Sequence, residues 1–165
     1  MERIFGTLNV RGDTETVLLG GAYLEHELQQ VIEAKFPLAK TDAELGKRLF
    51  DPYSGGVLNS FGAKIHVARA MEFIGPETYA DFKMILDIRN TFAHTLHSIS
   101  FAHSDIIEDC HKLNVRKYLR VFYKVAHNPP PVDDARHIFL YSLSGFISGL
   151  RSIVTKTASI IPIDR

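Results

Sequence analysis

Apolar residues recur along this chain mostly at intervals of three and four, which is the spacing of one face of an α-helix. Alternation of apolar and polar residues, typical of half-buried strands, is rare. The most regular apolar positions have heptad spacing near the C-terminus and are Phe139, Leu143, Phe146, Leu150 and Ile153. The pattern predicts an all-α fold in which residues 1–165 form a single multihelical domain of about six helices.

Capping residues and prolines predict where the helices begin and end. After an N-terminal arm over residues 1–12, Asp13 or Thr14 begins a helix that ends near Phe36. A Pro-rich turn at 128–131 precedes the last helix and is not a domain boundary, because too little chain follows it. The helices predicted between and after these points cover residues 43–50, 60–75, 77–94, 115–125 and 133–156.

Two pairs of glycines fall inside predicted helices, where glycine is unfavourable unless packing requires it. Gly20 and Gly21 adjoin the apolar stripe of the first helix, which consists of Leu24, Leu28 and Val31. Gly145 and Gly149 are four residues apart beside the C-terminal stripe. We expect a neighbouring helix to approach closely at both pairs. At Gly145 and Gly149 that neighbour belongs to the same chain or to a second copy, and we prefer a homodimer.

Charge and cysteine content narrow the class of protein. Nineteen basic residues balance nineteen acidic ones, so the net charge of the chain is zero. The overall charge therefore provides no attraction to nucleic acid or to a membrane surface. The single cysteine, Cys110, excludes an internal disulfide and suits a reducing cytoplasm. The N-terminus lacks the apolar run of a signal peptide, and the most apolar segment, 138–150, is too short to span a bilayer. We therefore expect a cytoplasmic protein.

The stretch DIRNTFAH, residues 87–94, places Arg, Asn and His within an otherwise apolar helix. On a helical wheel with Phe82 at zero, Arg89 lies at about 340°, inside the arc of the apolar residues. Asn90 and His94, four residues apart, share a polar side of the same helix. A buried arginine must be paired or solvated, because an unpaired buried charge is costly.

Two interpretations of this stretch remain open. In the first, which we favour, Arg89 forms a structural ion pair with Glu27 or, second, Glu25 of the first helix, and His94 interacts with the helix C-terminus. In the second, Arg89, Asn90 and His94 cleave RNA: the histidine moves a proton, the arginine stabilises the phosphorane and the asparagine positions the scissile group. Arg89 and His94 are about 140° apart on one helix, so such a site needs a frayed helix end or a partner protomer.

Residues 55–94 resemble the core of the mannitol operon repressor (MltR-like) family. The positions that carry the resemblance are Gly56, Leu58, Lys64, Ile65, Ala68, Gly75, Arg89 and His94, with Val57 where the family often has proline. The resemblance implies a compact helical domain that acts in transcriptional control through protein partners. The Arg-Asn-x-x-x-His string also resembles the HEPN nucleases, another all-α group that often works as dimers.

Other candidate chemistry is weak. The segment around residues 43–65 is unlike a helix-turn-helix, because its loop is too long and contains Gly-Gly, so we expect no direct DNA binding. A run of candidate ligands lacks the spacing of a zinc site: His94, His97, His103, Cys110 and His111. No phosphate-binding loop is present either, so we expect no metal and no cofactor. The sequence thus predicts a non-enzymatic regulatory protein whose partner is a protein, for instance a transcription regulator, with a metal-independent ribonuclease as the alternative.

Overall fold

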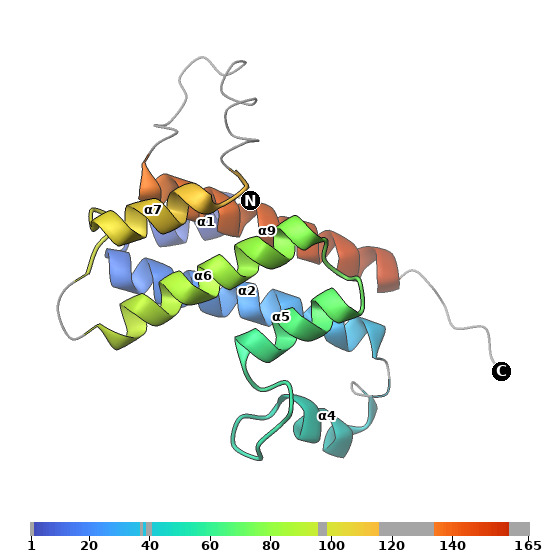
Figure 1. Cartoon of the computed structure of the whole chain (residues 1–165). Coiled ribbons are helices and arrows are strands. Elements are labelled where there is room, and N and C mark those ends of the chain that lie inside the picture. Colours follow the sequence, from blue (N-terminus) through green and yellow to red (C-terminus); the bar gives the residue numbers. More distant parts are fainter. Residues whose placement is uncertain (1, 37, 39–40, 96–98, 116–133, 159–165) are drawn as a thin grey trace.

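All regular secondary structure of the described residues is helical (Figure 1). The computed structural model describes all residues except 1, 37, 39–40, 96–98, 116–133 and 159–165. The helices of the described residues are α1 (Glu2–Asn9), α2 (Asp13–Lys35), α4 (Ala43–Phe50), α5 (Phe61–Ala70), α6 (Pro76–His94), α7 (Ser104–Lys112) and α9 (Ala135–Ala158). The prediction of an all-α fold is confirmed.

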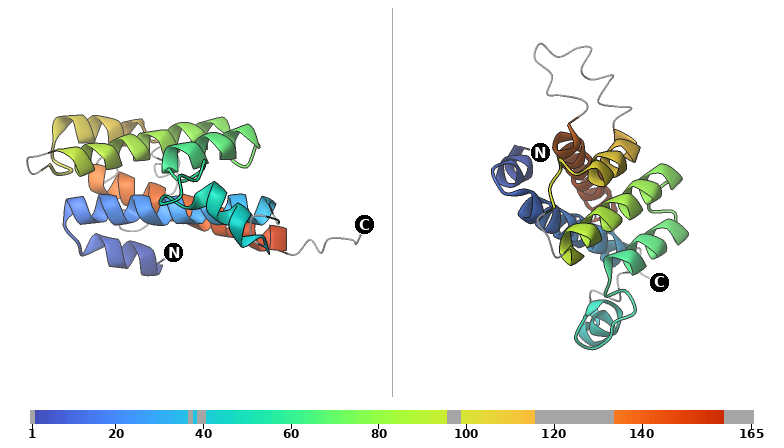
Figure 2. Two further views of the ribbon diagram at one scale, coloured as in Figure 1. Left: turned by 90° about the horizontal axis from the view of Figure 1, so that it is seen from below. Right: turned by 60° about the vertical axis from the view of Figure 1, so that its left-hand side comes forward.

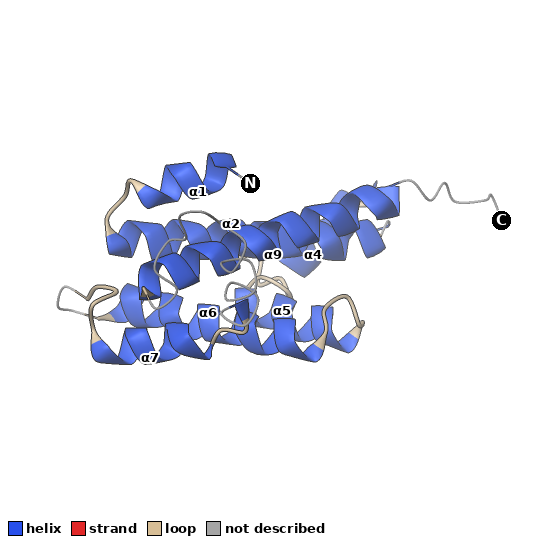
Figure 3. Cartoon of the chain, turned by 90° about the horizontal axis from the view of Figure 1, so that it is seen from above, coloured by secondary structure: helices blue, strands red, loops and turns tan. Residues whose placement is uncertain are grey.

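Helices α2 and α9 lie side by side in the middle of the bundle (Figures 2 and 3). Helix α1 packs on one side of this pair, and α5, α6 and α7 lie on the other side. Helix α6 runs antiparallel to α2, whereas α2 and α9 run parallel to each other (Figure 1). Helix α4 and the loop after it project from one side of this bundle (Figure 1).

The centre of the core is the contact between α2 and α9. The predicted stripe of α2, Leu24, Leu28 and Val31, is fully buried. Of the predicted α9 stripe, Phe139, Leu143 and Leu150 are buried and Phe146 and Ile153 are half-buried. A Cβ atom added at Gly20 would lie 2.3 Å from Cδ1 of Leu143, so the expected close approach of a helix at this glycine is confirmed.

Local capping signals placed three helix starts correctly. The Asp42 carboxylate accepts hydrogen bonds from two backbone amides at the start of α4, and the Ser60 hydroxyl accepts one from Ala63 N at 3.2 Å at the start of α5. Pro76 is the first residue of α6, where its missing N–H costs nothing. Helix α2 begins at Asp13, and α9 begins directly after Asp134, whose carboxylate accepts from His137 N at 2.8 Å.

Three boundaries differ from the sequence predictions. Residues 2–9 of the predicted N-terminal arm (1–12) form helix α1, with Leu8 buried. Helix α7 lies between the predicted helices 77–94 and 115–125, where no helix was predicted. Helix α5 ends at Ala70 rather than Gly75, because Glu72 takes a positive φ of 57° that stops the helix. Most of the predicted helix 115–125 and the whole Pro-rich turn 128–131 lie outside the described residues.

Helix α9 is longer than its most apolar segment. Over Ala135–Thr155 it is long and apolar enough to cross a membrane by length and composition. That criterion is also met by core helices of soluble proteins, and α9 buries its inner face against α1, α2 and α7. We describe it as a core helix.

Candidate functional site

The Arg-Asn-x-x-x-His residues lie on the second half of α6, but they do not form one pocket. Asn90 and His94 are exposed on one side of the helix, and Arg89 is half-buried on another. A Cβ atom added at Gly21 would lie 2.8 Å from Cδ of Arg89, so the arginine stem lies flat across this glycine of α2. Among the described residues, the Arg89 guanidinium forms no ion pair.

The predicted ion pair of Arg89 with Glu27 or Glu25 is wrong, because both carboxylates bind other cations. Glu27 accepts hydrogen bonds from Nε and Nη2 of Arg151 at 2.8 and 2.5 Å. Glu25 accepts from Nζ of Lys64 at 2.7 Å, and the lysine side chain is only 4% exposed.

The positions of these residues around their helices explain the difference. Glu27 lies about 120° from Gly21 around α2, so it faces α9 rather than α6. Glu25 shares the face of Gly21 but lies one turn further along, where α5 supplies Lys64. The buried side of α6 includes Asp81 and Ile88, so the buried face is centred further from Arg89 than its apolar residues suggested. Arg89 therefore lies at the edge of that face and not at its centre.

Because Arg89 has no ion pair within the described residues, we expect a modest effect of its removal. Arg89→Ala should lower the free energy of unfolding by about 1 kcal/mol, since the main loss is the packing of the alkyl stem on Gly21. Urea denaturation of both proteins measures this difference. A loss of about 3–5 kcal/mol, the cost of breaking a buried ion pair, would contradict the placement described above.

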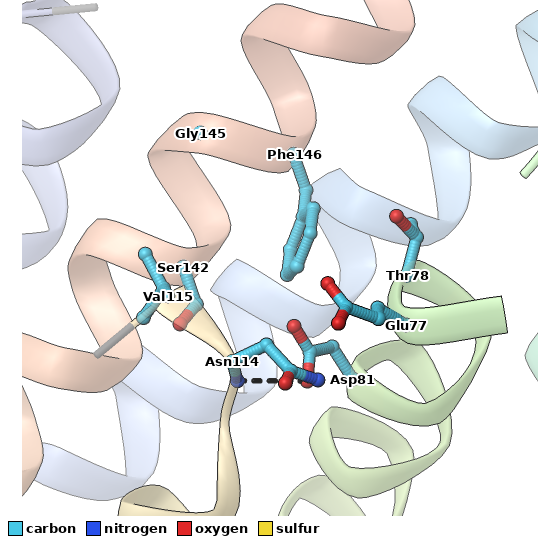
Figure 4. Close-up of a pocket in the computed structure, with 8 residues that line it drawn as sticks. All are labelled: Glu77, Thr78, Asp81, Asn114, Val115, Ser142, Gly145 and Phe146. Atoms are coloured by element: carbon cyan, nitrogen blue, oxygen red, sulfur yellow. Dashed lines mark hydrogen bonds between the residues drawn. The ribbon is translucent and has the colours of Figure 1, made fainter. Parts of the chain in front are cut away.

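A groove between the start of α6 and α9 contains two hollows that meet at Phe146. The first hollow has a volume of about 250 Å³ (Figure 4). Asp81 on its wall is buried and accepts from N and Nδ2 of Asn114 at 3.0 and 2.9 Å. Both carboxylates of this hollow, Glu77 and Asp81, also have further interaction partners. Its lining is Glu77, Thr78, Asp81, Asn114, Val115, Ser142, Gly145 and Phe146.

The second hollow is apolar and has a volume of about 200 Å³. Phe146 lines both hollows, and its ring packs edge-on against Phe82, with ring centroids 5.0 Å apart. We call this second hollow the apolar hollow. It is lined by Phe73, Ile74, Gly75, Thr78, Phe82, Gly145, Phe146, Gly149, Leu150 and Ile153.

Gly145 and Gly149 form the exposed floor of the groove. A Cβ atom added at either glycine meets no atom of the described residues within 4 Å. The close approach predicted for this pair is therefore not made within the described chain, in contrast to Gly20 and Gly21. Of the two predicted neighbours, a second copy of the chain stays a prediction, and the same chain is left only with its residues outside the described part.

The open space above Gly149 gives a test of whether the hollow is free in the isolated protein. Gly149→Ala should raise the free energy of unfolding by up to about 1 kcal/mol, because alanine favours the helix and its methyl group meets nothing. Thermal unfolding at low protein concentration measures this change. Destabilisation by the alanine would mean that another part of the chain fills the hollow.

The remaining candidate residues offer no chemistry in the described structure. Cys110 is buried, and desolvation raises the pKa of its thiol to about 12, so it stays protonated and unreactive. His103 caps α7 through its ring nitrogen, which accepts from Asp105 N. Within the described residues, no group of three or more His, Cys, Asp or Glu side chains is arranged to hold a metal ion.

Sequence reasoning found one wall of the groove and missed the other. The α9 side was singled out through Gly145, Phe146, Gly149, Leu150 and Ile153, but nothing predicted that the start of α6 forms a pocket with it. The available signal was Asp81, an acidic residue on the side of α6 that also carries Ile85 and Ile88. A carboxylate at such a position must be bonded within the fold, as Asp81 is to Asn114.

Comparison of the chain with protein-family profiles, curated proteins and solved structures found no match. The fold and the groove show what class of protein this is. It is a helical bundle with an open apolar hollow between the start of α6 and helix α9. The resemblances of residues 55–94 to the mannitol operon repressor family and to the HEPN nucleases rest on the sequence motifs alone.

Proposed function

We propose that this protein is a cytoplasmic regulatory protein that acts in transcriptional control by binding a protein partner. The observation that carries the proposal is the apolar hollow, whose glycine floor allows a partner helix to approach α9 closely. The resemblance of residues 55–94 to the mannitol operon repressor family supports the transcriptional part. The zero net charge supports a protein partner over direct binding to DNA.

Filling the hollow tests this proposal. Gly149→Leu places a side chain where a partner would pack, and its Cβ atom meets no described residue within 4 Å. Partners captured from cell extract should be retained by wild type and lost by Gly149→Leu, with Arg89→Ala as a matched variant outside the groove. Equal capture by wild type and Gly149→Leu would overturn the proposal, as would tight binding of duplex DNA at physiological salt.

A second copy of this chain is also a protein partner, and we retain the proposal of a homodimer. Light scattering of wild type and Gly149→Leu distinguishes this case. A dimeric wild type and a monomeric, folded variant would place the dimer contact on α9. An unchanged mass would remove the dimer from this surface.

A ribonuclease is the second candidate function, because one observation favours it. The Arg89 guanidinium has no ion pair within the described residues, and Asn90 and His94 are exposed on the same helix. An unneutralised arginine and an exposed histidine are the groups that metal-independent RNA cleavage uses, although two protomers would be needed to bring them together.

The assay is incubation of single-stranded RNA in chelator with wild type and His94→Ala side by side. We expect neither protein to cleave RNA under the regulatory proposal. Cleavage by wild type that is absent in His94→Ala would favour the nuclease, provided both melt at the same temperature. His94 is exposed, so its removal should leave stability within about 0.5 kcal/mol of wild type.

A further inference from the structure

Arg136 connects the start of α9 to the end of α1. Its Nη1 atom forms an ion pair with Asp13, the first residue of α2, and its guanidinium lies 5.8 Å from the ring centroid of Phe101. Asp13 in turn accepts from Phe101 N at 3.0 Å. The Nη2 atom of Arg136 lies within hydrogen-bonding distance of four oxygens, the carbonyls of Leu8 (3.2 Å), Asn9 (3.2 Å) and Arg11 (2.6 Å) and the hydroxyl of Thr16 (3.1 Å).

Two of these oxygens, the carbonyls of Leu8 and Asn9, belong to the C-terminal turn of α1, whose carbonyls have no partner within the helix. The Leu8 carbonyl also accepts from Oγ1 of Thr16 at 3.0 Å. A cation in the last turn of a helix is favourable, because the helix dipole is negative there. For α9 the same arginine is in the first turn, where a cation is unfavourable. The position of Arg136 is therefore explained by α1 and not by its own helix.

Helix α1 depends on such contacts because it is only eight residues long. Helices of this length are not stable alone in water. Leu8 is buried, and its Cδ1 atom would lie 3.6 Å from a Cβ atom at Gly20, so α1 covers the seam where α2 meets α9.

We propose that α1 is a strap that opens separately from the rest of the bundle, and that Arg136 is the latch that keeps it closed. Opening uncovers the apolar seam at Gly20 without separating α2 from α9. This conformational device is independent of the partner groove, which lies between α6 and the second half of α9.

Hydrogen exchange of individual amides tests the latch. Arg136→Ala should speed exchange of the amides of Gly6 to Asn9 by about tenfold or more, with little change at Ile85 and Ile88 of α6. Arg151→Ala is the matched control, because it removes another arginine of α9 that pairs with α2 but does not contact α1. It should leave the relative exchange of α1 and α6 unchanged.

Arg136→Lys provides a second variant, since it keeps the charge but cannot reach all four oxygens. Trypsin cleavage after Arg11 should also become faster in both Arg136 variants. Exchange that rises by the same factor in α1 and α6 would show that Arg136 stabilises the whole bundle and would overturn the proposal. Unchanged exchange in α1, or failure of both variants to fold, would overturn it as well.

Discussion

Glu25→Ala is expected to lower the free energy of unfolding by about 3 kcal/mol. The substitution leaves the ammonium of Lys64, which is 4% exposed, without its partner inside the contact of α2 and α5. A buried charge without a partner loses its hydration and gains nothing in return, and breaking such pairs from one side costs about 3–5 kcal/mol. We place the loss at the lower end because the Glu25 side chain is 19% exposed.

Urea denaturation measures this loss, with Glu44→Ala as the control. Glu44 pairs with Arg48 on the surface of α4, where both side chains are more than 70% exposed, so its removal should cost about 0.5 kcal/mol or less. Replacing both partners, as Glu25→Leu with Lys64→Met, should recover most of the loss, because no charge then stays buried. Equal midpoints for Glu25→Ala and Glu44→Ala would argue against a buried pair.

Gly20→Val is the second substitution with a large expected effect, a loss of about 2–3 kcal/mol. Its Cβ would lie 2.3 Å from Cδ1 of the fully buried Leu143, which cannot move without displacing other core residues. The contact between α2 and α9 would have to widen. Thermal unfolding followed by circular dichroism measures the change.

Gly149→Val separates this clash from the general cost of valine in a helix. A Cβ atom at Gly149 meets no described residue within 4 Å, so this variant should unfold close to wild type. If both variants lose the same stability, helix propensity and not the close contact at Gly20 determines the result.

Local signals in the sequence predicted most helix starts. Asp42, Ser60 and Pro76 each act on their own helix, and their effect does not depend on distant residues. Helix α7 was missed because its cap is His103, which is not a usual capping residue. Helix α1 was missed because its C-terminal carbonyls bind Arg136, which lies 128 residues from Leu8 in the chain.

The candidate site was harder to predict, because it depends on how helices rotate against one another. The apolar residues of α6 suggested that Arg89 faces the core, but the buried side also includes the polar Asp81. The sequence correctly identified Glu27 as an inward-facing carboxylate. Its partner Arg151, however, lies on α9, 124 residues away in the chain. The glycines of α9 indicated a close neighbour, and only the structure shows that the described chain does not supply one.

The parallel pairing of α2 and α9 also determines the order in which this chain can fold. These helices make the most extensive contact of the bundle, and their ion pair joins residues 124 positions apart. Such separation is unusual for helical proteins, whose contacts are mostly local and which therefore fold fast. During synthesis the apolar face of α2 has no α9 to cover it until almost the whole described chain has left the ribosome. Formation of the contact between α2 and α9 is thus a late event, whereas α5 and α6, which also pack against α2, are synthesised earlier.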